Sequence, residues 1–133
     1  MPMTPSATAA ERAAAVVLVA IGLGFGLPTP FVIDHLRRTG ELPMTPFGFR
    51  AMSGPFERLG PDAFTALLVA FAAVCATDVA AGALTWNGDR RGPRLAALAT
   101  PPGVILAAGF ALPFYLASVP LWSALLLSAR RRR

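Results

Sequence analysis

Long apolar stretches, each bounded by charged or turn-forming residues, dominate the hydrophobic pattern of this chain. Three such stretches cover about residues 10–33, 63–85 and 95–129. A helix needs about 20 apolar residues to cross a hydrocarbon layer of about 30 Å, so each stretch is long enough to span a membrane. The pattern therefore predicts an all-α membrane protein.

The third stretch is too long for a single crossing. Residues 95–129 contain no charge, and one straight helix of that length would reach about 50 Å at about 1.5 Å per residue. A turn near Pro113 would divide it, because proline can begin a helix at a position where no N–H is needed. We therefore expect two helices, at about residues 94–111 and 113–130.

A re-entrant hairpin is the alternative for this stretch. Pro101, Pro102 and Gly103 interrupt the expected third helix, and irregular backbone is tolerated at membrane depth where protein buries it. The sequence leaves both possibilities open, namely that residues 95–129 cross twice or that they enter and leave on one side.

The placement of arginine predicts the orientation. All twelve basic residues are arginines, and the formal net charge is +5. Arginine clusters precede and follow the third stretch, and such clusters are retained on the cytoplasmic side of membranes. We therefore expect a four-transmembrane-helix bundle in the cell membrane, a single domain over residues 1–133 with both termini cytoplasmic. The cytoplasmic side would hold Arg12, Arg90, Arg91, Arg94, Arg130, Arg131, Arg132 and Arg133, and the opposite side Arg37, Arg38, Arg50 and Arg58.

The only sizeable loop, residues 34–61, is expected to be ordered and to lie outside the cytoplasm. Gly60-Pro61-Asp62 is a helix-start signal. Phe47, Phe49 and Phe56 recur among charged residues, a pattern that favours short helical turns lying in the membrane interface.

Composition agrees with a membrane protein and narrows its chemistry. Charged residues make up 14% of the chain, well below the roughly 25% of an average soluble domain. The arginines lie at the ends of apolar stretches, so the basic excess does not indicate nucleic-acid binding. Cys75 is the only cysteine and lies within an apolar stretch, which excludes an intrachain disulfide and predicts a buried, unreactive thiol.

Asp78 is the main candidate for chemistry, because it is the only acidic residue deep within a predicted crossing. Placing a carboxylate there costs about 2.5 to 3.5 kcal/mol on insertion scales, so Asp78 should face the bundle interior. A functional Asp78 would be a catalytic group, carry a proton or anchor a ligand. A structural Asp78 would instead join helices through Thr77, Thr100, Ser118 or Tyr115.

Further candidate ligand-binding residues are Thr77 beside Asp78, the adjacent Asp34 and His35, and two loop arginines, Arg50 and Arg58. A single histidine cannot make an ordinary zinc site unless carboxylates complete it. We expect neither a metal nor a cofactor. The loop arginines suit an anionic or polar group, and mutual ion pairing at the membrane surface is the alternative.

Two further patterns concern packing. Trp86 and Tyr115 lie near predicted helix ends, which suits the interfacial aromatic belt. Gly22 and Gly26 are spaced by four residues, and such small residues let membrane helices approach closely. We expect this packing within the molecule, and a dimer interface is the alternative.

In size and hydropathy profile the chain resembles several groups of small four-helix membrane proteins, including the DoxX-like group, the small multidrug transporters and the sterol-isomerase-like domain. The first loop is too long for a small multidrug transporter, and no motif of the other groups is matched. Motifs of soluble active sites, such as G-x-S-x-G or H-E-x-x-H, are missing as well. The resemblance therefore supplies no site residue.

Our leading hypothesis is a non-enzymatic bundle that acts as an accessory or scaffold subunit, or binds a lipid-like molecule, with residues 34–61 as its recognition surface. Besides the lipid bilayer, its partners would be another membrane protein or further copies of the chain. One alternative is a membrane enzyme or binding protein for an apolar isoprenoid, quinone or sterol-like substrate. The other is an oligomeric proton-coupled transporter that uses Asp78 as the carrier.

Overall fold

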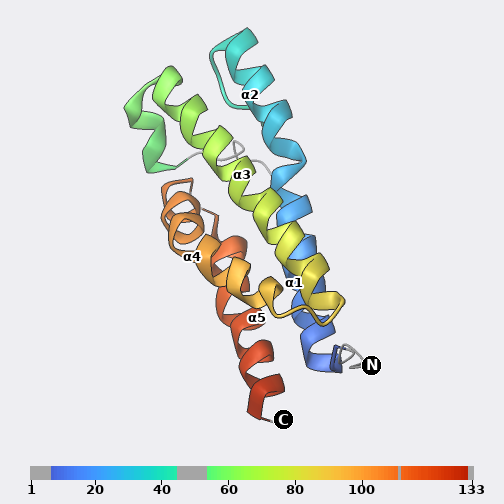
Figure 1. Ribbon diagram of the computed structural model, residues 1–133. Helices are drawn as coiled ribbons and strands as arrows, with labels where there is room; N and C mark the ends of the chain where they lie inside the picture. The colour runs from blue at the N-terminus through green and yellow to red at the C-terminus, as the bar shows by residue number, and fades with distance from the viewer. Residues whose placement is uncertain (1–6, 45–53, 111, 132–133) are drawn as a thin grey trace.

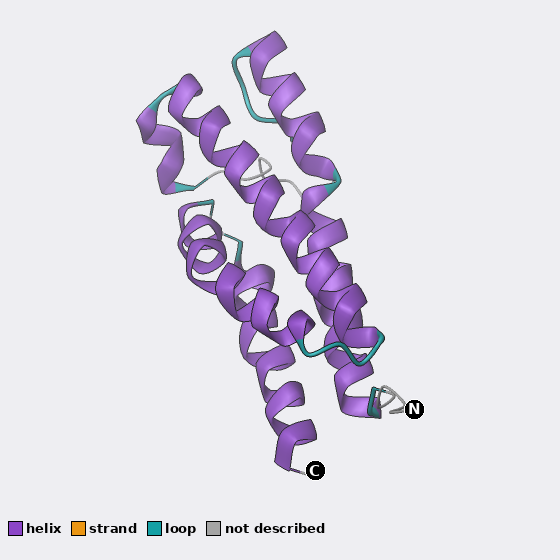
Figure 2. Ribbon diagram, in the orientation of Figure 1, coloured by secondary structure: helices purple, strands orange, loops and turns teal. Residues whose placement is uncertain are grey.

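The computed structural model describes residues 7–44, 54–110 and 112–131, and these residues contain helices and no strand (Figure 2). The elements in chain order are α1 (Ala9–Gly26), α2 (Pro28–Thr39), the 3-10 helix η1 (Pro55–Leu59), α3 (Pro61–Trp86), α4 (Arg91–Gly109) and α5 (Pro113–Arg131). The predicted all-helical fold is confirmed. The third apolar stretch also turns where the sequence predicted, between Gly109 and Pro113.

A capping box starts α1, because Thr8 Oγ1 accepts a hydrogen bond from the Glu11 N–H and Glu11 Oε1 accepts one from the Thr8 N–H. At the other end, Leu27 keeps a helical conformation and donates its N–H to the Leu23 carbonyl. Helix α2 therefore continues α1 directly through Pro28.

The continuation through α2 corrects the expected start of the first loop. Asp34 and His35 lie within α2, which ends at Thr39 where Gly40 takes a left-handed conformation with φ 76°. Proline near the start of α2 does not stop the helix, because Pro28 is its first residue and needs no N–H there. The loop therefore begins at Gly40.

Four helices pack around a square in the order α1, α3, α4 and α5, with each helix against the next and α5 against α1 (Figure 1). Helices α3 and α5 thus occupy opposite corners. The start of α1, the turn from α3 to α4 and the end of α5 lie at one end of the bundle, and α2 and η1 lie at the other (Figure 1).

Two helical stretches, Ala9–Thr39 and Pro61–Trp86, are long and apolar enough to cross a membrane. They pack against each other at glycines. A Cβ atom on Gly22 would lie 2.6 Å from the Cys75 carbonyl oxygen, and one on Gly82 would lie 2.9 Å from the Ala15 carbonyl oxygen. The predicted use of Gly22 in close packing within the molecule is confirmed.

Helix η1 covers the turn between α4 and α5. The Phe56 ring packs against Gly109 and stands edge-on to Phe110 with a centroid separation of 5.2 Å. Phe110 is fully buried and contacts Phe64 and Phe71 of α3 as well. This short helical turn fits the expected order in the first loop, whereas Phe47, Phe49 and Arg50 lie outside the described residues.

Candidate functional site

Two buried polar side chains meet across the diagonal of the bundle. The Tyr115 hydroxyl of α5 donates a hydrogen bond of 2.6 Å to Oδ2 of Asp78 on α3. Asp78 is 5% exposed and Tyr115 is 2% exposed. Because α3 and α5 occupy opposite corners of the square, this hydrogen bond passes through the middle of the bundle.

The other two helices touch the same phenol. A Cβ atom on Gly103 of α4 would lie 2.6 Å from the Tyr115 hydroxyl oxygen, so even a methyl group has no room there. Phe25 of α1 stands edge-on to the Tyr115 ring with a centroid separation of 6.1 Å, and Phe71 does so at 5.5 Å. All four helices therefore converge on Tyr115.

The other three hydroxyl side chains considered as partners of Asp78 donate instead to backbone carbonyls of their own helices. Thr77 is half-buried and donates to the Ala73 carbonyl oxygen at 2.9 Å. Thr100 donates to the Ala96 carbonyl oxygen at 2.8 Å, and Ser118 donates to the Tyr115 carbonyl oxygen at 2.6 Å. Of the four partners considered for Asp78, Tyr115 is therefore the one it has.

The position of Tyr115 corrects an expectation from the sequence. Its place in the first turn of α5 suggested the interfacial aromatic belt, yet its ring lies in the bundle interior. The physical reason is its hydroxyl, which finds a buried carboxylate to bond. Trp86 is 47% exposed and lies under the Arg12 guanidinium, which is 5.0 Å from its ring centroid.

The polar residues expected at the first loop lie on two separate elements, α2 and η1. Asp34 pairs with Arg38 one helical turn later, and both side chains are exposed. The His35 ring lies 6.1 Å from that of Phe31. Arg58 is exposed in η1. These residues do not join Asp78, and no group of three or more metal-binding side chains occurs in residues 7–44, 54–110 and 112–131.

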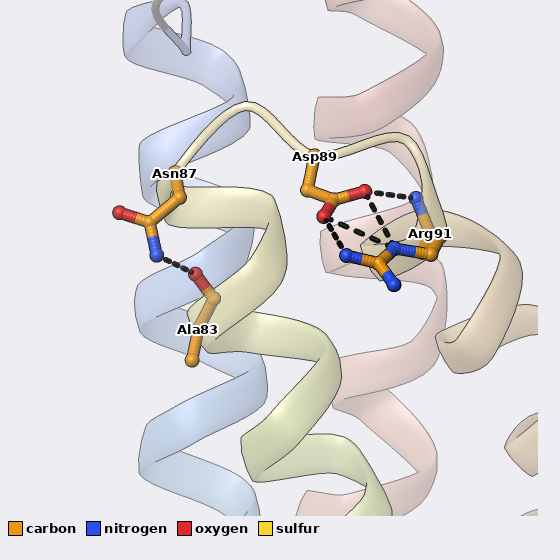
Figure 3. A network of polar contacts seen from close by, with 4 residues as sticks. All are labelled: Ala83, Asn87, Asp89 and Arg91. Atoms are coloured by element: carbon orange, nitrogen blue, oxygen red, sulfur yellow. Dashed lines mark hydrogen bonds and ion pairs between the residues drawn. The ribbon is translucent and has the colours of Figure 1, made fainter.

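A polar pocket of about 330 Å³ opens at the end of the bundle where α3 turns into α4. Sequence reasoning treated the arginines of this turn only as topology signals. The turn itself is fixed by local bonds: Asn87 Nδ2 donates to the Ala83 carbonyl at 3.0 Å, and Arg91 Nη2 lies 2.8 Å from Asp89 Oδ2 (Figure 3). The lining residues are Glu11, Gly88, Asp89, Arg90, Pro93, Arg94, Leu126 and Ala129.

The Asp89–Arg91 pair explains the electrostatics of that turn. The side chain and backbone N–H groups of Arg91 donate to the Asp89 carboxylate and hold its pKa below the usual range. The carboxylate in turn raises the pKa of Arg91. Both charges of this pair are therefore satisfied within the turn.

Comparison of the chain with protein-family models, with characterised proteins and with solved structures finds no match.

Proposed function

We propose that the chain spans the membrane four times with both termini in the cytoplasm, and that it is a non-enzymatic accessory or scaffold subunit. Asp78 carries this proposal, because this buried acidic residue bonds to Tyr115, the side chain on which all four helices converge.

The position of the turn between α4 and α5 along the bundle axis favours two full crossings by α4 and α5 and argues against a re-entrant hairpin. Phe110, which ends α4, packs between Phe64 and Phe71 of α3. The distance along α3 from that level to Trp86 is about 28 Å at about 1.5 Å per residue. This length matches a hydrocarbon layer of about 30 Å, so the turn would reach the far surface.

The arginines support the orientation. Arg90, Arg91 and Arg94 lie where α3 turns into α4, and the α5 end that carries Arg131 lies at the same end of the bundle (Figure 1). Arginine is retained on the cytoplasmic side. The start of α1 lies at the same end of the bundle (Figure 1), so it is cytoplasmic in this proposal as well.

The opposite end supplies the proposed recognition surface. Helix α2 buries Val32 and Leu36 against α3 and exposes Asp34, Arg37 and Arg38. In the proposed topology this charged face of α2 lies beyond the membrane, at the same end of the bundle as η1. A membrane-protein partner or another copy of the chain would bind there.

The enzyme and transporter alternatives both need an Asp78 that exchanges a proton or a ligand. The packing of the Tyr115 phenol against Gly103 and Phe25 argues against both, because Asp78 is buried and hydrogen-bonded to this phenol within the bundle. We therefore favour a structural role for the carboxylate.

The test is a comparison of the parent protein with Asp78→Asn and Arg37→Glu, each cross-linked in native membranes and then purified. We expect parent and Asp78→Asn to retain the same partner, or the same oligomer, and Arg37→Glu to lose it. A stoichiometric isoprenoid, quinone or sterol that the parent carries and Asp78→Asn lacks would contradict the proposal.

A further inference from the structure

We propose that the pocket at the turn from α3 to α4 binds the headgroup of an anionic phospholipid, with one acyl chain lying along α4 and α5. This inference rests on the proposed topology, which puts the pocket at the inner membrane surface. The lipid would be a bound component of the bundle and would be distinct from the recognition surface on α2.

The pocket is lined by basic side chains from one helix and by apolar side chains from another. Arg90 and Arg94 come from the start of α4, whereas Leu126 and Ala129 come from the end of α5. Both arginine side chains are exposed, and no ion pair engages either of them in the part of the chain that the structure describes. They are therefore available to an anion at the membrane surface.

The acidic residues of the pocket leave an excess of positive charge at the turn. Asp89 is held by Arg91 through side-chain and backbone hydrogen bonds (Figure 3). Glu11 accepts the Thr8 N–H in the capping box of α1. At this turn three arginines, at positions 90, 91 and 94, thus outnumber the two carboxylates of the pocket, Glu11 and Asp89.

A second pocket continues the first along the bundle. This apolar groove of about 390 Å³ runs between α4 and α5. Pro93 and Leu126 line both pockets, so the two are adjacent. Ala97 and Trp122 form part of the groove beyond them.

The succession of a polar cavity and an apolar groove matches the headgroup and acyl chain of a phospholipid. A polar cavity with two available arginines lies at the bundle end, and an apolar groove leads from it toward the middle of the bundle. Basic pockets between transmembrane helices on the cytoplasmic side are known to suit anionic headgroups. A zwitterionic lipid carries no net negative charge, so the unpaired arginines would increase its binding affinity less.

The experiment is native mass spectrometry of the detergent-purified full chain titrated with phosphatidylglycerol, with phosphatidylcholine as the neutral lipid. We expect selective binding of phosphatidylglycerol, weakened about fivefold by Arg90→Gln or Arg94→Gln alone and roughly 25-fold by both. Arg91→Gln is the matched control, because its side chain is already engaged by Asp89; it should change binding less than twofold.

A second pair of variants tests the proposed acyl-chain groove and changes two exposed alanines that lie in different grooves. Ala97→Phe should fill the groove between α4 and α5 and weaken phosphatidylglycerol binding, whereas Ala20→Phe, in an apolar groove between α1 and α3, should leave it unchanged. Circular dichroism of each variant shows whether the bundle still folds.

Three results would overturn the inference. The first is binding that the double arginine variant leaves unchanged, and the second is an equal loss in Arg91→Gln. The third is full competition by glycerol 3-phosphate, which would identify a site for a free phosphate ester. Each of these can occur in a protein with the proposed four crossings, so failure here is distinguishable from failure of the proposed topology.

Discussion

Tyr115 of α5 and Asp78 of α3 are joined by a 2.6 Å hydrogen bond through the centre of the bundle. They are 37 residues apart in the sequence and lie on helices at opposite corners of the square. The stability of the bundle should therefore depend on this pair more than on any surface contact.

Removing the phenolic hydroxyl should destabilise the protein. Tyr115→Phe leaves the Asp78 carboxyl buried without its donor, and we expect the free energy of unfolding to fall by about 1 to 2 kcal/mol. Asp78→Leu combined with Tyr115→Phe should recover most of this loss, because neither partner is then left unpaired. Unfolding by sodium dodecyl sulfate in mixed micelles measures the difference. Equal stability of parent and Tyr115→Phe would argue against an interhelical role for the bond.

A single methyl group at position 103 should disturb the same pair. Its Cβ would lie 2.6 Å from the Tyr115 hydroxyl oxygen, so Gly103→Ala must displace the phenol and should cost about 1 to 3 kcal/mol. Gly24→Ala is the matched control, since a Cβ there meets nothing within 4 Å. Thermal unfolding followed by circular dichroism compares the two, and an effect of Gly24→Ala as large as that of Gly103→Ala would show that glycine removal as such is responsible.

The turn between α3 and α4 should lose stability in acid. Because Arg91 lowers the pKa of Asp89, the folded protein binds fewer protons at this site than the unfolded chain. The stabilisation is therefore complete above the usual Asp pKa of about 4 and is lost as pH falls through the lowered value. The gap in unfolding temperature between the parent and Asp89→Asn should shrink over that range. A gap that stays constant to low pH would mean that the pair adds nothing.

Cys75 should resist modification in the folded protein. Its side chain is fully buried, and a Cβ on Gly26 of α1 would lie 2.9 Å from its own Cβ. We expect no reaction with a small maleimide until the bundle is unfolded by detergent. Rapid labelling under native conditions would show that α1 and α3 separate readily.

The sequence could predict the helices because their lengths are set by simple physical limits. One straight helix over residues 95–129 would exceed the thickness of a bilayer, so we expected a turn in this stretch, and Pro113 marked its place. The extension of the first helix to Thr39 was missed, because two prolines and several charges resemble a helix end when each is considered alone.

The site was predicted only in part. Asp78 stood out as an acidic residue in an apolar stretch, but no local pattern could identify Tyr115 as its partner, since a contact between α3 and α5 depends on how all four helices pack. The pocket at Arg90 and Arg94 was missed for the same reason, because its floor comes from α5. The charge cluster itself was visible, and its spacing around Pro93 is the signal that could have drawn attention to it.

The most direct measurement of the central claim is the accessibility of single cysteines to a membrane-impermeant maleimide in a Cys75→Ala background. Four separate variants would carry a cysteine at Thr39, at Asn87, at Leu112 or after Arg133. The account predicts labelling of positions 39 and 112 from outside the cell only, and of position 87 and the added terminal cysteine only after the inner face is exposed. Labelling of position 112 from the inner face, or of the terminal cysteine from outside, would contradict a bundle with four crossings and two cytoplasmic ends.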